Sequence, residues 1–147
     1  MSWSIISYQS AWAHAHDWEL VLFMSLAPKF INQSPEFQDL EWLSKWKQYW
    51  LNHKLEFVNG CSDLNLEEHL VSAERRSEFI YFLEKYSSWL EEFGTVFPKD
   101  KINKLIGIGG MQLTEPCKIS YLLEFSEKLK AVVNKNFEHD KVQRENA

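Results

Sequence analysis

The stretch SPEFQDLEWLSKWKQYWLNHKLEFV, residues 34–58, decides how we interpret the fold. Ser34 is a favourable N-cap residue and Pro35 suits the first helical position. The pair that follows the stretch, Asn59-Gly60, favours a left-handed C-terminal stop. On a helical wheel the apolar residues lie on two sides and leave a polar sector of only about 80°. We therefore expect one continuous helix that neighbouring elements cover on both sides.

Local signals also delimit other helices. A first helix should end at Ala27, because the residue before Pro28 avoids the α region. Asn65 begins a possible capping box, Ser72 can cap the longest of these helices, and Gly94 stops it. The segments 73–93 and 114–137 have the apolar spacing of helices with one inward stripe. The expected helices cover approximately residues 10–26, 66–71, 73–93, 98–105 and 114–137.

We find no segment that alternates apolar and polar residues between turn signals, so we expect no strand. The predicted fold class is all-α: a compact single-domain bundle of five or six helices around the central helix 34–58. The helical domain should occupy residues 1–138, and residues 139–147 form a polar tail that we expect to be frayed.

Composition narrows the class of protein. The 147 residues have a formal net charge of −5, which disfavours nonspecific binding to nucleic acid or to an anionic membrane. The N-terminal segment has no Lys or Arg before Lys29, and no apolar run approaches the roughly 20 residues that span a bilayer. We therefore expect a cytoplasmic protein, with no nucleic acid and no membrane among its partners.

Residue types that perform catalysis are present but poorly arranged for it. On a helix, His14 and His16 would point about 160° apart and could not share a metal ion. The glycines of Gly107-Ile108-Gly109-Gly110 lack the strand and the lysine that a phosphate-binding loop needs. We therefore expect no catalytic residue, no metal and no cofactor.

The two cysteines, Cys61 and Cys117, have no zinc-ligand spacing. Free thiols are expected in a cytosolic protein, although a single disulfide between them stays open.

Acidic residues gather in the middle of the chain. Residues 63–92 contain eight carboxylates and three basic residues. Such a segment is either a solvated surface or a docking surface for a basic protein, since charge speeds encounter and an aromatic anchor slows release. The candidate partner-binding residues are Asp63, Glu67, Glu68, Glu74, Glu78 and Tyr81.

In overall character, carried by these same residues, the chain resembles the α-helical immunity proteins of contact-dependent growth inhibition toxin systems. That resemblance implies a bacterial inhibitor that is monomeric until it meets its cognate toxin domain. The toxin domain would be a basic protein, often a nuclease, and the inhibitor would block its activity through the acidic surface.

Two other functions stay open. The first is a small helical enzyme or ligand-binding domain with an aromatic pocket beside the central helix, lined by Trp42, Trp46, Tyr49 and His53. The second is a scaffold subunit or homodimer, in which the surplus of aromatic residues marks self-association.

Overall fold

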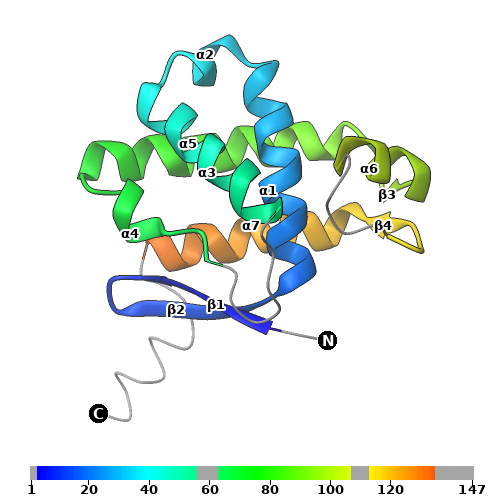
Figure 1. Cartoon of the computed structure of the whole chain (residues 1–147), viewed down its shortest axis with the longest axis horizontal. Helices are drawn as coiled ribbons and strands as arrows, with labels where there is room; N and C mark the ends of the chain where they lie inside the picture. Colours follow the sequence, from blue (N-terminus) through cyan, green and yellow to red (C-terminus); the bar gives the residue numbers. More distant parts are fainter. Residues whose placement is uncertain (1–2, 56–62, 107–112, 135–147) are drawn as a thin grey trace.

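The computed structural model describes residues 3–55, 63–106 and 113–134 (Figure 1). Within these ranges it contains helices and two small antiparallel sheets. The helices are α1 (Asp17–Asn32), α2 (Pro35–Gln38), α3 (Glu41–Leu55), α4 (Leu66–His69), α5 (Ala73–Glu91), α6 (Lys99–Ile106) and α7 (Ile119–Val133). The strands are β1 (Trp3–Tyr8), β2 (Ala11–His16), β3 (Val96–Phe97) and β4 (Cys117–Lys118). The all-α prediction is therefore wrong, although the fold is mostly helical.

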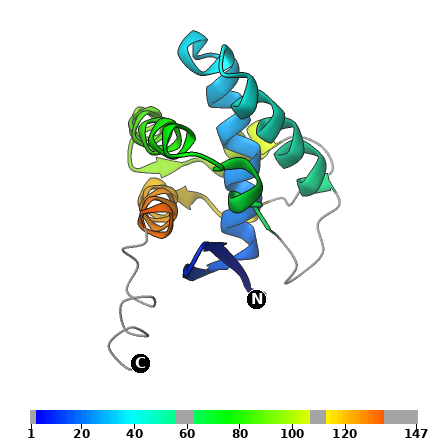
Figure 2. The same cartoon turned by 90° about the vertical axis from the view of Figure 1, so that its left-hand side faces the viewer.

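Helix α1 is the central element of the structure. It is buried on nearly every side and contacts α2, α3, α5, α6, α7 and β2. In Figure 2 it stands between α3 on one side and the pair α5 and α7 on the other. The expected stop at Ala27 is wrong: Pro28 lies inside α1, which continues to Asn32. Burial of Phe30 and Ile31 stabilises the turn that follows the proline.

The expected single helix over residues 34–58 is interrupted. The central helix of the fold is α1, not this segment. Its first part is the one-turn helix α2, and the chain bends at Asp39 and Leu40 before α3 begins. The bend turns the ring of Phe37 into the core, against Phe30 and Phe82. Core packing of this one ring thus outweighs the local preference for a continuous helix. The expected stop at Asn59-Gly60 lies outside the described residues.

The segment expected to open the first helix, residues 10–16, instead contributes β2 to the hairpin β1–β2. Its strands pair in register from Trp3 with His16 to Tyr8 with Ala11, and Gln9 in the turn has φ 56°. One face of the hairpin is buried and consists of Ser4, Ile6, Tyr8, Ala11, Ala13 and Ala15. The alternation of burial has the period of a strand, but its inner residues on β2 are alanines, which favour helices. The Ser4 hydroxyl donates a hydrogen bond to the Asp17 carboxylate, and this bond connects the hairpin to the first turn of α1.

The second sheet has two strands of two residues each, and it pairs the chain before α6 with the chain before α7. Phe97 pairs with Cys117, and α7 therefore begins at Ile119 rather than at the expected Thr114. Cys117 is a buried free thiol whose pKa is raised by burial. Cys61, the Gly107–Gly110 segment and the tail at 139–147 lie outside the described residues.

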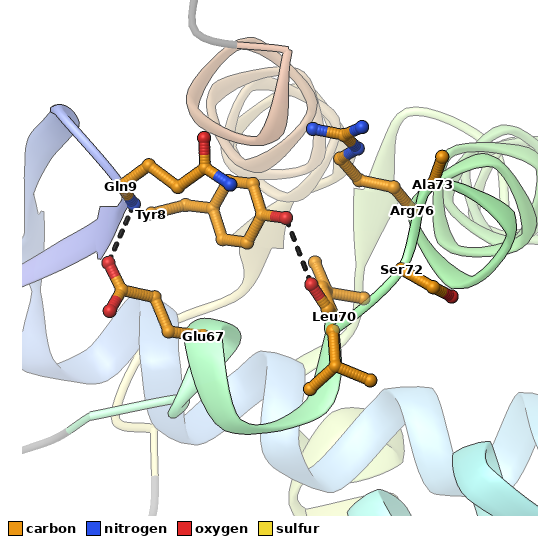
Figure 3. A pocket seen from close by; sticks show the side chains of 8 residues that line it. Tyr8, Gln9, Glu67, Leu70, Ser72, Ala73 and Arg76 are labelled. Carbon is orange, nitrogen blue, oxygen red and sulfur yellow. Dashed lines mark hydrogen bonds between the residues drawn. The ribbon is translucent and has the colours of Figure 1, made fainter.

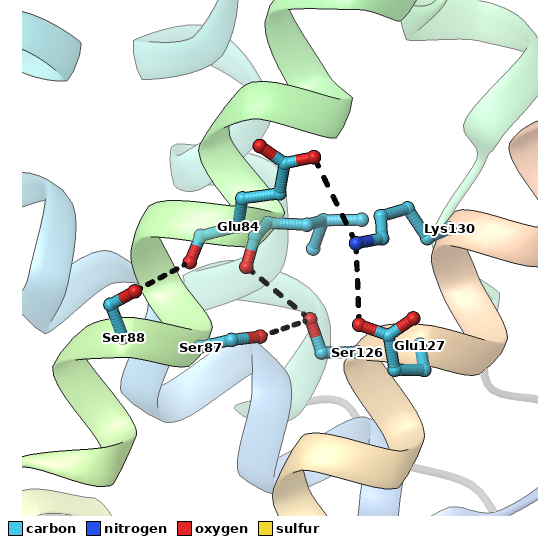
Figure 4. Close-up of polar contacts among 7 residues, drawn as sticks. Glu84, Ser87, Ser88, Ser126, Glu127 and Lys130 are labelled. Atoms are coloured by element: carbon cyan, nitrogen blue, oxygen red, sulfur yellow. Dashed lines mark hydrogen bonds and ion pairs between the residues drawn. The ribbon is translucent and has the colours of Figure 1, made fainter.

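Helix α5 confirms its sequence prediction. The Ser72 side chain accepts a hydrogen bond from the backbone N–H of Arg75, and Gly94 follows the helix with φ 91°. On the side facing α7, Ser87 donates to Ser126 across 2.9 Å (Figure 4). Lys130 lies 3.9 Å from Glu84 and 3.2 Å from Glu127, so polar contacts complete the α5–α7 interface.

The expected short helix after Pro98 is also present, as α6. Among the described residues, none of the helices combines the length and the apolar character that crossing a bilayer requires.

Candidate functional site

The six predicted partner-binding residues fall into two groups. Asp63, Glu67 and Glu68 lie just before or on α4, whereas Glu74, Glu78 and Tyr81 follow one another along a single side of α5. Glu78 is half-buried and the other five are exposed.

In the first group, two carboxylates stabilise the chain itself. The Asp63 carboxylate accepts a hydrogen bond from the Asn65 backbone N–H at 2.9 Å. Glu67 accepts one from the Gln9 N–H at 2.6 Å and so connects α4 to the turn of the β1–β2 hairpin. Asn65 has φ 56° and its side chain caps nothing, so the expected capping box is absent. These contacts give Asp63 and Glu67 a structural role.

Glu67 also lines an open pocket of about 510 Å³ between the hairpin turn and the start of α5 (Figure 3). The Tyr8 hydroxyl donates to the Leu70 carbonyl at 2.9 Å on its inner wall. Arg76 and Glu67 bring charges of opposite sign to the lining. Because the lining residues contain no nucleophile paired with a general base, we assign no reaction to this pocket.

The second group is joined by residues that the sequence analysis did not place beside it. The indole N–H of Trp42 on α3 donates to the Glu78 carboxylate at 3.1 Å. Glu36 on α2 forms a hydrogen bond with Tyr81; this bond is the main cause that raises the pKa of Tyr81. Glu41 shares an open hollow of about 370 Å³ with Trp42. We call this surface the α5 acidic face, and it consists of Glu36, Glu41, Trp42, Glu74, Glu78 and Tyr81.

Negative charge on the α5 acidic face is only partly compensated. Glu41 pairs with Lys45 at 3.6 Å. Among the described residues, no ion pair involves Glu36, Glu74 or Glu78. Two other cations lie over aromatic rings of this face, Arg75 at 5.5 Å from the Trp42 centroid and Lys85 at 5.4 Å from the Tyr81 centroid.

The aromatic residues of the alternative pocket hold the chain together. Trp46 is fully buried and donates its indole N–H to the Leu64 carbonyl at 2.7 Å. The Tyr49 hydroxyl donates to the Asp63 carbonyl at 2.7 Å, and the His53 ring, which stacks on Tyr49, accepts from the Asp63 N–H at 3.3 Å. Trp46, Tyr49 and His53 therefore fasten residues 63 and 64 to α3. Only Trp42 of the four lines the hollow of the α5 acidic face.

The two histidines considered as metal ligands are arranged differently from the prediction. His14 and His16 lie two residues apart on β2, so they share one side of the strand instead of diverging on a helix. Trp3 packs against His16, with ring centroids 3.5 Å apart. Within the part of the chain that the structure describes, no group of three His, Cys, Asp or Glu residues could hold a metal ion.

The α5 acidic face thus offers carboxylates from three helices and two partly exposed aromatic rings. Exposed aromatic rings beside carboxylates are residue types that surfaces binding basic proteins use. Comparisons of this chain with protein-family models, with curated proteins and with solved structures found no match.

Proposed function

We propose that this protein is an immunity-type inhibitor that binds a basic toxin domain, a nuclease, through the α5 acidic face and blocks its activity. It acts in the cytoplasm, is a monomer until it meets the toxin, and is neither an enzyme nor dependent on a cofactor. The observation that supports the proposal is the cluster of Glu36, Glu74 and Glu78, which lack ion pairs among the described residues and flank Trp42 and Tyr81.

The chemistry of a nuclease explains why such a surface would inhibit it. An active site that binds the phosphates of nucleic acid is basic, and side-chain carboxylates can occupy it in place of phosphates. The negative field of the α5 acidic face would raise the association rate. Trp42 and Tyr81 are the kind of aromatic side chain that contributes most to slow dissociation.

Co-expression with the neighbouring gene product is the test. A basic, toxin-like open reading frame immediately upstream of this gene would supply the candidate toxin domain. We would express that domain together with this chain, and measure cell survival and the dissociation constant of the purified complex. The double variant Glu74→Lys/Glu78→Lys should weaken binding by about tenfold or more and lose protection. The matched control is Glu91→Lys/Glu92→Lys, which makes the same charge change at the other end of α5.

A further variant separates charge from folding. Glu78→Gln keeps an oxygen that accepts the Trp42 N–H but removes the negative charge. It should fold as the wild type does and bind the toxin more weakly, with a smaller dependence on salt. Equal weakening by both double variants, or wild-type binding by Glu74→Lys/Glu78→Lys, would contradict the proposed interface.

A further inference from the structure

A second surface feature lies at the N-terminal end of α1, on elements that do not form the α5 acidic face. It is an open pocket of about 410 Å³ between the hairpin, α1 and α7. From here on the name aromatic pocket refers to this pocket, and not to the one that the sequence suggested beside residues 34–58. Its lining is Trp3, His16, Trp18, Glu19, Tyr121, Glu124 and Lys128.

Aromatic rings form one wall of this pocket. The His16 ring lies between two indoles, 3.5 Å from Trp3 and 5.9 Å from Trp18 by ring centroids. Tyr121 meets Trp18 edge-on at 6.3 Å. Trp3 and Tyr121 remain 49% and 44% exposed, so their rings are available to a ligand.

The one lysine in the lining is already engaged by the protein. Lys128 donates to the His14 carbonyl at 3.0 Å and lies 3.8 Å from the Glu19 carboxylate. Glu19 is buried and also accepts the backbone N–H of His16 at 3.0 Å. Glu124 is exposed and has no ion pair among the described residues. The lining therefore has one carboxylate more than it has lysines.

Aromatic faces beside an uncompensated carboxylate attract organic cations, because the ring quadrupole presents negative charge on its face. The protein already places an ammonium at one of these rings: Lys118, which does not line the pocket, lies 5.7 Å from the Tyr121 centroid. We propose that the aromatic pocket binds an alkylammonium cation. Two sources share that chemistry, a free quaternary ammonium compound and a methylated lysine side chain of a protein.

This proposal is independent of the inhibitor function, since it rests on different residues. The experiment is a titration of the full chain, followed by tryptophan fluorescence and by the NMR signals of the indole N–H groups. The probes are choline, a peptide with one trimethyl-lysine, and 3,3-dimethylbutan-1-ol. The last has the shape of choline without its charge. We expect millimolar binding of choline or of the peptide, and much weaker binding of the neutral alcohol.

Substitutions at two exposed positions test whether the cation binds in this pocket. Tyr121→Ala and Glu124→Gln should each weaken binding of the cation by about threefold to tenfold. Tyr81→Ala is the matched control, because it removes an equally exposed tyrosine that also has a lysine over its ring, on the α5 acidic face. This control should leave cation binding unchanged and weaken binding of the toxin. Tyr121→Ala should weaken cation binding and leave binding of the toxin unchanged.

Preference for choline over the peptide would identify the free compound as the source, and the reverse preference would identify a protein ligand. The proposal is overturned if neither cation binds, or if the neutral alcohol binds as tightly as choline. It is also overturned if both pocket variants bind the cation as the wild type does while circular dichroism shows them folded.

Discussion

Replacing Trp46 with phenylalanine should destabilise the protein strongly, although the substitution keeps an aromatic ring. Phenylalanine has no N–H, so the Leu64 carbonyl loses its 2.7 Å hydrogen bond in a buried setting, which costs about 1–3 kcal/mol. The smaller ring also leaves space among Trp50, His69 and Phe79, whose centroids lie 4.8–5.0 Å from that of Trp46. Because Trp→Ala costs about 3–5 kcal/mol in a core, we assign roughly 1–2 kcal/mol to this partial truncation.

Together these losses predict a decrease of about 2–5 kcal/mol in the free energy of unfolding. Urea titration followed by circular dichroism measures it, and the melting temperature should fall by about 5–20 °C. Trp42→Phe is the matched control, one turn earlier on α3, where the ring is half-buried and its N–H bonds to Glu78. Its cost should be about 1 kcal/mol or less. Equal costs at the two positions would refute a structural role specific to Trp46.

Three other substitutions probe different parts of the fold. Ser126→Val should lower stability by about 1 kcal/mol in urea unfolding, because it removes the buried partner of Ser87; no loss would mean that the hydroxyl pair contributes nothing. Ser72→Ala should cost about 1 kcal/mol by the same measurement, since Ser72 caps the Arg75 N–H at the start of α5. Burial is the main cause that lowers the pKa of His69. The contribution of this side chain to folding stability is therefore complete above the unfolded pKa of about 6.5, and it is lost as the pH falls toward the folded pKa. The urea midpoint should therefore fall less between about pH 7.5 and pH 5.5 in His69→Gln than in the wild type, and identical pH dependences would show that this ring does not contribute.

The sequence predicted α5, because both ends of that helix are specified locally. For α5, Ser72 and Gly94 act through bonds and angles within a few residues, and both occur as expected. It did not predict features that depend on distant contacts. The bend before α3 serves the packing of Phe37, and Pro28 is accommodated because α1 is enclosed by other elements. Residues 11–16 were misread because their inward alanines favour helices, while pairing with β1 decides the outcome.

The candidate site was predictable only where one helix defines it. Glu74, Glu78 and Tyr81 share a side of α5 because of helical periodicity alone. Glu36 meets Tyr81 across two helices, α2 and α5, that are far apart in the chain, so no pattern in the sequence indicated that contact. The aromatic pocket was hidden for a similar reason: Trp3, Trp18 and Tyr121 come from a strand and two helices, and they meet only after the hairpin has formed.

The central claim is that the α5 acidic face is the surface that the toxin covers. Hydrogen–deuterium exchange of this chain, free and in complex with its cognate basic toxin domain, tests it most directly. We predict that backbone amides of residues 36–42 and 73–81 exchange more slowly in the complex. Slowed exchange confined to the hairpin at residues 3–16, with residues 36–42 and 73–81 unchanged, would contradict the claim.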